Sequence, residues 1–107
     1  MDETEFHMLA DATITGIEQD MEEADQDGRL EVETMGGVLT LQLPDGKQYV
    51  ISKHAPTRQV WVSSPVSGAH HFSYDASAKA WVLSSGQELR QLLKAWKAAS
   101  TTMYRNG

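Results

Sequence analysis

The fold is decided by residues 38–52, which read VLTLQLPDGKQYVIS. Apolar and polar residues alternate from Leu39 to Leu43, and the Pro44-Asp45-Gly46 that follows is a combination typical of a tight hairpin turn. Alternation with a period of two is the pattern of a strand that has one buried face. The stretch therefore predicts two neighbouring antiparallel strands, at residues 38–43 and 47–52.

The segments on either side of this hairpin continue the strand pattern. Before it, apolar and acidic residues alternate from Leu30 to Thr34, and Gly36-Gly37 makes a tight connection into the next strand. After it, strands are expected at residues 58–64, 69–74 and 80–83.

Two segments with helical periodicity enclose the strands. Residues 2–24 carry apolar side chains at steps of three and four, and a turn rich in Asp and Gly at 24–28 ends this helix. A second helix is expected at about residues 87–103, where Ser85 and Glu88 have the spacing of a capping box. The first apolar stripe consists of Phe6, Leu9, Ala10, Thr13, Ile17, Met21 and Ala24, and the second of Leu89, Leu92, Leu93, Trp96 and Met103.

Each helix has a single apolar stripe, so each must pack against the sheet. The simplest arrangement is a two-layer α-β sandwich of the α+β class. Its N- and C-terminal helices lie on one face of an antiparallel sheet, and the other face is open to solvent. A chain of 107 residues has room for one domain with one core, so we expect a single domain at 1–107.

The composition excludes several classes of protein. Without cysteine there is no disulfide framework, no thiol nucleophile and no iron–sulfur cluster held on thiolates of this chain. No apolar run is long enough to span a membrane, and the acidic N-terminus does not resemble a targeting peptide. A cytoplasmic protein without a membrane partner is therefore expected. No phosphate loop, catalytic triad context or HExxH motif is present, so we do not expect an enzyme.

The negative charge is concentrated in the first third of the chain. Twelve of the fifteen acidic residues lie within positions 1–33, where Arg29 is the only Lys or Arg. Such a distribution repels nucleic acid and attracts cations or basic protein surfaces. A solubilising charged face is the alternative without a specific function.

The acidic side chains of the first helix fall on one side of it. At about 100° per residue, His7, Asp11, Glu18, Glu22 and Asp25 occupy an arc of roughly 60° beside the apolar stripe. Glu31 and Glu33 point outward from the nearby strand, and Glu23 extends the same field. We call these eight residues the acidic ridge. Repulsion between Glu18 and Glu22 costs helix stability, which favours a functional role.

The chemistry expected of the ridge is weak. Carboxylates suit hard cations and accept Fe²⁺ or Fe³⁺, but a row with one imidazole and no thiolate implies no tight transition-metal site. A calcium loop at residues 23–34 is rejected because Thr34 stands where the bidentate acid is required.

An aromatic residue is expected on the open face of the sheet. If Val60 and Val62 face the helices, Trp61 lies among polar residues on the opposite face, where it would anchor a partner. The reversed register, with Trp61 in the core, is the alternative. His70 and His71 follow on the neighbouring strand, one facing each way, and haem ligation by either is a minor option.

Several short stretches, in order along the whole chain, resemble the frataxin family and its bacterial branch in particular. They are Glu5-Phe6-His7, Leu9-Ala10-Asp11, Gly36-Gly37-Val38-Leu39-Thr40, Pro56 with Gln59-Val60-Trp61, Ser63-Ser64-Pro65, Ser67-Gly68, and Trp81. One departure concerns Ser52, Lys53 and His54, which stand where the family usually has Asn, a base and Gln.

The resemblance implies a regulator of iron–sulfur cluster assembly that binds iron, as Fe²⁺ or Fe³⁺, weakly on the ridge, with other divalent cations as alternatives. The implied partners are a cysteine desulfurase, whose activity the protein modulates, and an iron–sulfur scaffold protein. We expect a monomer, and oligomerisation with iron is left open. The implied metal ligands are His7, Asp11, Glu18, Glu22, Glu23, Asp25, Glu31 and Glu33. The implied partner contacts are Trp61, Gln59, Glu18 and Glu22.

The residues leave a second hypothesis open. In it the chain is an interaction module that docks on the desulfurase or scaffold through its acidic face, and bound metal is incidental. An iron-oxidising enzyme or iron store would require an enclosed site, against which the open surface carboxylates argue.

Overall fold

The computed structural model describes residues 1–25 and 28–96. Its helices and strands are α1 (Glu3–Ala24), β1 (Glu31–Met35), β2 (Val38–Gln42), β3 (Gln48–His54), the 3-10 helix η1 (Ala55–Thr57), β4 (Gln59–Ser64), β5 (Gly68–Asp75) and β6 (Ala80–Val82). Residues 89–96 are also helical and are called the second helix below. The rest of the helix expected at 87–103, with Met103, lies outside the described residues.

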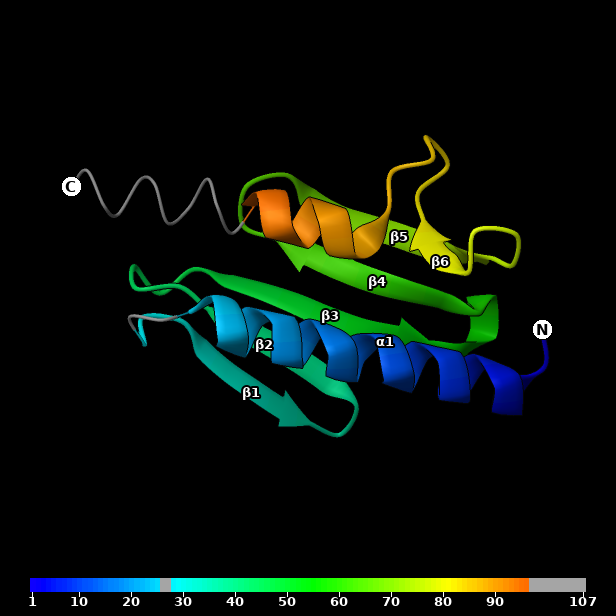
Figure 1. Ribbon diagram of the computed structural model, residues 1–107, viewed down its shortest axis with the longest axis horizontal. Helices are drawn as coiled ribbons and strands as arrows, with labels where there is room; N and C mark the ends of the chain where they lie inside the picture. The colour runs from blue at the N-terminus through cyan, green and yellow to red at the C-terminus, as the bar shows by residue number, and fades with distance from the viewer. Residues whose placement is uncertain (26–27, 97–107) are drawn as a thin grey trace.

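The six strands form one antiparallel sheet in the order β1-β2-β3-β4-β5-β6. Both helices lie on the same face of this sheet and run in the same direction across it, α1 over β1 to β3 and the second helix over β4 and β5 (Figure 1). The expected α+β sandwich is therefore confirmed.

The core lies between the helices and one face of the sheet. Alternate residues of the strands point to this face, as the period of two predicts. The buried side chains are Phe6, Ala10, Ile14, Ile17 and Met21 of α1, Leu39, Leu41, Leu43, Tyr49, Ile51, Val60, Val62, Phe72 and Trp81 of the sheet region, and Leu89 and Leu93 of the second helix.

The apolar stripe of α1 differs from the expected one at two positions. Ile14 is buried and was not predicted, whereas Ala24 at the helix end is exposed. Thr13 is half-buried, and its hydroxyl accepts a hydrogen bond from the Trp81 indole N–H at 3.0 Å. A buried indole N–H needs an acceptor, and Thr13 is on the stripe for that polar contact.

The expected capping box at the second helix is wrong. The Glu88 carboxylate accepts hydrogen bonds from the backbone N–H groups of Arg90 at 2.8 Å and Gln91 at 3.2 Å, so Glu88 is itself the N-cap. The Ser85 hydroxyl instead contacts the Gln87 side chain at 3.2 Å. The helix begins at residue 89 because Glu88 pairs with Val82 of β6 in an isolated bridge.

Candidate functional site

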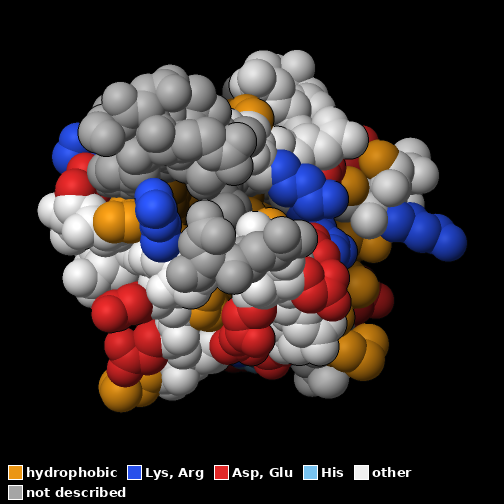
Figure 2. Space-filling view, turned by 60° about the vertical axis from the view of Figure 1, so that its left-hand side comes forward, with side chains coloured by type: hydrophobic (Ala, Val, Ile, Leu, Met, Phe, Trp, Pro, Cys, Tyr) orange, Lys and Arg blue, Asp and Glu red, His pale blue; other side chains and the backbone are white. Residues whose placement is uncertain are grey.

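The acidic side chains gather on one side of the molecule. In the space-filling view, most Asp and Glu side chains lie in the lower half of the visible face (Figure 2). The ridge residues of α1 are exposed or half-buried, as expected for a helix flank beside the apolar stripe. The contacts of these residues differ along the helix.

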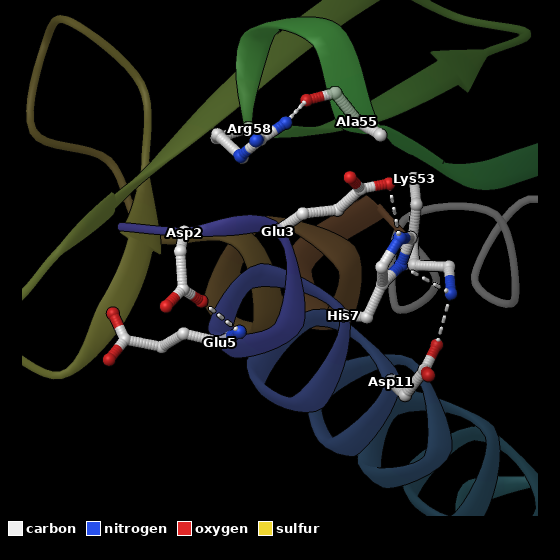
Figure 3. Close-up of polar contacts among 8 residues, drawn as sticks. All are labelled: Asp2, Glu3, Glu5, His7, Asp11, Lys53, Ala55 and Arg58. Atoms are coloured by element: carbon white, nitrogen blue, oxygen red, sulfur yellow. Dashed lines mark hydrogen bonds and ion pairs between the residues drawn. The ribbon is translucent and has the colours of Figure 1, made fainter.

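Near the start of α1, His7 and Asp11 share a basic partner. Lys53 extends from β3 and places its Nζ 2.7 Å from Asp11 Oδ1 and 3.2 Å from His7 Nδ1. The other ring nitrogen of His7 lies 3.5 Å from Glu3 Oε1. Figure 3 shows His7, Asp11 and Lys53 pointing toward one another across the gap between α1 and the sheet. Two predicted metal ligands are thus brought together, with an ammonium group between them.

Near the end of α1, two carboxylates bind groups of the protein. Glu18 Oε2 accepts a hydrogen bond from the Thr34 hydroxyl of β1 at 2.5 Å. The two oxygens of Asp25 accept from the backbone N–H groups of Arg29 at 3.0 Å and Leu30 at 2.9 Å. Asp25 therefore holds the turn that leads into β1. Its carboxylate oxygens each retain a second acceptor position.

The strand part of the ridge is separated from the helix part by the sheet. Thr34 contacts α1, and successive residues of a strand point to opposite faces. Glu31 and Glu33, opposite Gln42 and Thr40 of β2, consequently lie on the open face. From the sequence, all ridge carboxylates were expected to lie together at the edge of the sheet. The register instead puts those of α1 on the helix side of the sheet and Glu31 and Glu33 of β1 on its open face.

The remaining ridge carboxylates are the most accessible ones. Glu22, Glu23, Glu31 and Glu33 are exposed, and within residues 1–25 and 28–96 their side chains make no hydrogen bond or ion pair. In the same part of the chain, no three His, Asp or Glu side chains come close enough to hold one metal ion together. The arrangement can therefore bind a hydrated cation through one or two carboxylates at a time.

Trp61 lies on the open face of the sheet, which confirms the predicted register. Val60 and Val62 on either side of it are buried against the helices, at 0% and 1% exposure. The indole N–H of Trp61 donates to Gln59 Oε1 at 3.0 Å, and Gln59 Nε2 donates to Ser73 Oγ at 3.2 Å. The predicted contact residues Trp61 and Gln59 are thus held together by a hydrogen-bonded chain across β4 and β5.

Two histidines enclose Trp61, an arrangement that sequence reasoning missed. The His54 ring stacks on one side with its centroid 3.8 Å away, and the His71 ring stacks at 4.2 Å. His71 is directly opposite Trp61 in the register, but His54 is reached only diagonally from β3. The strand boundaries predicted from sequence ended β3 at residue 52, so His54 was left outside the sheet.

His70 points to the opposite side from His71, as expected for neighbours on a strand. Its Nε2 lies 2.8 Å from the Ser67 hydroxyl, and its ring lies 5.3 Å from that of Trp96 in the second helix. Haem ligation through Nε2 of His70 would therefore require its contact with Ser67 to break.

No helix in the described part of the chain has the length and apolar character needed to cross a membrane.

Comparisons with known proteins extend the likeness over most of the chain. Residues 1–102 match the family model described as a frataxin-like domain. The iron-sulfur cluster assembly protein CyaY of Vibrio cholerae is 41% identical over 95 residues, which cover 88% of this chain and 86% of that protein. CyaY of Pseudomonas aeruginosa is 40% identical over 88 residues, or 82% of this chain and 79% of that protein.

Solved structures give the same result for the fold. Frataxin from Psychromonas ingrahamii superimposes with a TM-score of 0.83 at 27% identity, covering 95% of this chain and 93% of that one. Trimeric frataxin from the yeast Saccharomyces cerevisiae, complexed with ferrous iron, superimposes with a TM-score of 0.75 at 30% identity, covering 86% and 84%.

Proposed function

The chain belongs to the frataxin-like family, and from this premise we propose that it regulates iron–sulfur cluster assembly. In this proposal it binds iron weakly on the acidic ridge and modulates a cysteine desulfurase. The names of the Vibrio and Pseudomonas relatives support the pathway, and the ferrous complex of the yeast structure supports the metal. We place this activity in the cytoplasm and assign no catalytic step to the chain itself.

The accessible carboxylates carry the proposal for iron. Glu22 and Glu23 on α1 and Glu31 and Glu33 on β1 are exposed, and oxygen ligands suit ferrous and ferric ions. Glu18 and Asp25 have acceptor positions beyond those that their protein contacts use. A surface that offers one or two carboxylates to each ion binds it weakly and releases it readily. In this proposal iron is an ion that the protein passes on or senses, and it is not a permanently bound cofactor.

The open sheet face supports the proposal for protein partners. Trp61 is held between His54 and His71, so its position is fixed before a partner arrives. A preorganised aromatic side chain loses little conformational entropy on binding and is a common interface anchor. We assign this face to contacts with the desulfurase or the scaffold protein.

A second candidate function is docking that does not depend on metal. It is favoured by the contacts of Asp11, Glu18 and Asp25, whose carboxylates already bind groups of the protein. The remaining exposed acids would then match a basic surface of the desulfurase, and binding would weaken steeply with salt.

Desulfurase binding and activity, measured with and without Fe²⁺, distinguish the two functions. Glu22→Gln removes one charge from the ridge, and Glu5→Gln removes one charge from an exposed position in the first turn of α1. If iron acts through the ridge, Glu22→Gln weakens the iron-dependent effect and Glu5→Gln does not. Equal loss of docking by Glu22→Gln with and without iron would favour the metal-independent module, and no loss in either condition would contradict both.

A further inference from the structure

Contacts with neighbouring residues hold the Lys53 side chain in a defined position between the sheet and α1. Ile51, two residues before Lys53 and on the same face of β3, is fully buried. The aliphatic part of the Lys53 side chain therefore also points to the helix side of the sheet. Its side chain is only 19% exposed. Gly37, with φ of +80°, makes room for the stem, because a Cβ there would come within 3.3 Å of Lys53 Cε.

The ammonium group of Lys53 occupies the lone pair of His7 Nδ1 that a metal ion would need, and it places a positive charge beside Asp11. An ammonium only donates hydrogen bonds, so His7 Nδ1, 3.2 Å away, must be the acceptor of this contact. Asp11 Oδ1 accepts at 2.7 Å. A divalent cation coordinated by His7 Nδ1 would require the one lone pair of this nitrogen, which the ammonium group already occupies. Asp11 keeps other acceptor positions, but a cation bound beside it would meet the positive charge of Lys53 2.7 Å from Oδ1.

We propose that Lys53 is an internal cation that occupies the His7–Asp11 pair and directs metal ions to the other end of the ridge. His7 and Asp11 are one helical turn apart, a spacing at which two side chains can bind one ion. With Lys53 in place, a cation binds there only after displacing the ammonium. Glu22 and Glu23, whose side chains make no ion pair within residues 1–25 and 28–96, then take the ion before the His7–Asp11 pair does. This inference rests on the proposed function of the ridge.

The test uses the full chain with Mn²⁺ alone as the probe. Mn²⁺ broadens the backbone amide signals of residues close to its binding site, so each end of α1 reports separately in an NMR titration. In the wild-type protein, broadening is expected first at residues 22 and 23. In Lys53→Met, which keeps most of the apolar stem, we expect residues 7 and 11 to broaden at an Mn²⁺ concentration lower by about fivefold.

Three further variants separate charge from packing. Lys53→Arg keeps the positive charge and should behave as the wild type, whereas Lys53→Gln should behave as Lys53→Met and serves if the methionine variant does not fold. Lys47→Met removes an exposed lysine of the β2–β3 turn and should change nothing at residues 7 and 11.

The outcomes for the two proposals are distinct. Two results overturn the role of Lys53 and leave the ridge function standing. One is unchanged broadening at residues 7 and 11 in both neutral variants. The other is broadening at residues 7 and 11 of the wild type that is as strong as at residue 22. Broadening at residues 7 and 11 in the neutral variants, with no response at residues 22 and 23 in any variant, supports the occupation of the His7–Asp11 pair by Lys53. It contradicts metal binding at the Glu22–Glu23 end of the ridge, and with it the proposal that ions are directed there. No response anywhere contradicts both.

Discussion

At the scale of single residues, two positions other than glycine within residues 1–25 and 28–96 adopt the left-handed backbone region. Arg58 has a φ of +55° after η1, and Lys79 has a φ of +53° in the turn before β6. An L-residue pays about 1–2 kcal/mol for this conformation because its Cβ crowds the carbonyl oxygen. Arg58 gains a hydrogen bond from its guanidinium to the Ala55 carbonyl, whereas Lys79 is exposed and no such contact involves it in the described residues.

Replacing Lys79 with glycine should therefore stabilise the protein. We expect Lys79→Gly to raise the free energy of unfolding by about 0.5 kcal/mol, since relief of the left-handed strain exceeds the entropy that glycine loses on folding. Urea denaturation followed by far-ultraviolet circular dichroism measures the change. Lys79→Ala is the matched control, because it removes the same long side chain and keeps the Cβ. An equal gain in both variants would show that the side chain, and not the backbone, is the cause.

The position of a single side chain could be predicted where it depends on the geometry of one strand. The alternation around Val60 and Val62 favoured the open face for Trp61, with the reversed register as the alternative, because strand geometry puts neighbouring residues on opposite faces. The stacking of His54 and His71 on Trp61 depends on two neighbouring strands and their register. The sequence likewise predicted no contact for Lys53, because its contact with Asp11 joins residues far apart in the chain.

At the scale of elements, the start of the second helix depends on Glu88. Its carboxylate accepts from two backbone N–H groups of the first turn, which would otherwise lack partners. We expect Glu88→Ala to lower the free energy of unfolding by about 1 kcal/mol. Ser85→Ala should lower it far less, because among the described residues the Ser85 hydroxyl contacts only Gln87. Thermal denaturation of the two variants checks this, and the reverse order would restore the capping box that the sequence predicted.

An ion pair joins the two helices, and its arginine side chain passes next to Gly16 of α1. Arg90 Nη2 lies 2.6 Å from Asp20 Oδ2, and a Cβ at Gly16 would come within 3.2 Å of Arg90 Nη1. Gly16 in α1 costs up to about 1 kcal/mol of helix stability relative to alanine. Its small size therefore leaves the space through which Arg90 reaches Asp20.

This contact makes the effect of Gly16→Ala depend on Arg90. In the wild type, we expect only part of the helix-propensity gain, because the new methyl group displaces the guanidinium. In an Arg90→Ala background the gain should be larger by about 0.5 kcal/mol. A double-mutant cycle of unfolding free energies measures this coupling, and additive effects would mean that the ion pair adapts to the methyl group without loss.

At the scale of the whole molecule, the uneven charge should make stability sensitive to salt. The net charge is −6, and most acidic residues lie in α1 and β1, where like charges repel in the folded state. Raising NaCl from about 10 mM to about 500 mM screens this repulsion. We expect the melting temperature to rise by about 3 °C, which corresponds to roughly half a kcal/mol for a domain of this size.

A ridge-neutralised variant is the control for this effect. Glu22→Gln/Glu23→Gln removes two exposed like charges and should raise the melting temperature at low salt while reducing its further rise with NaCl. An unchanged salt response would mean that the acidic residues are too far apart in the folded state to repel one another appreciably.

The sequence by itself determined the sandwich, the order of its elements and the helical part of the acidic ridge. Each of these follows from periodicity within one segment, where a side chain's direction depends only on the local backbone. The tertiary structure alone decided which ridge carboxylates remain accessible. It places Glu31 and Glu33 on the open face through the β1–β2 register, and it sets the Lys53 ammonium against His7 and Asp11. These relations join distant segments, and only the packing of α1 on the sheet brings them within reach.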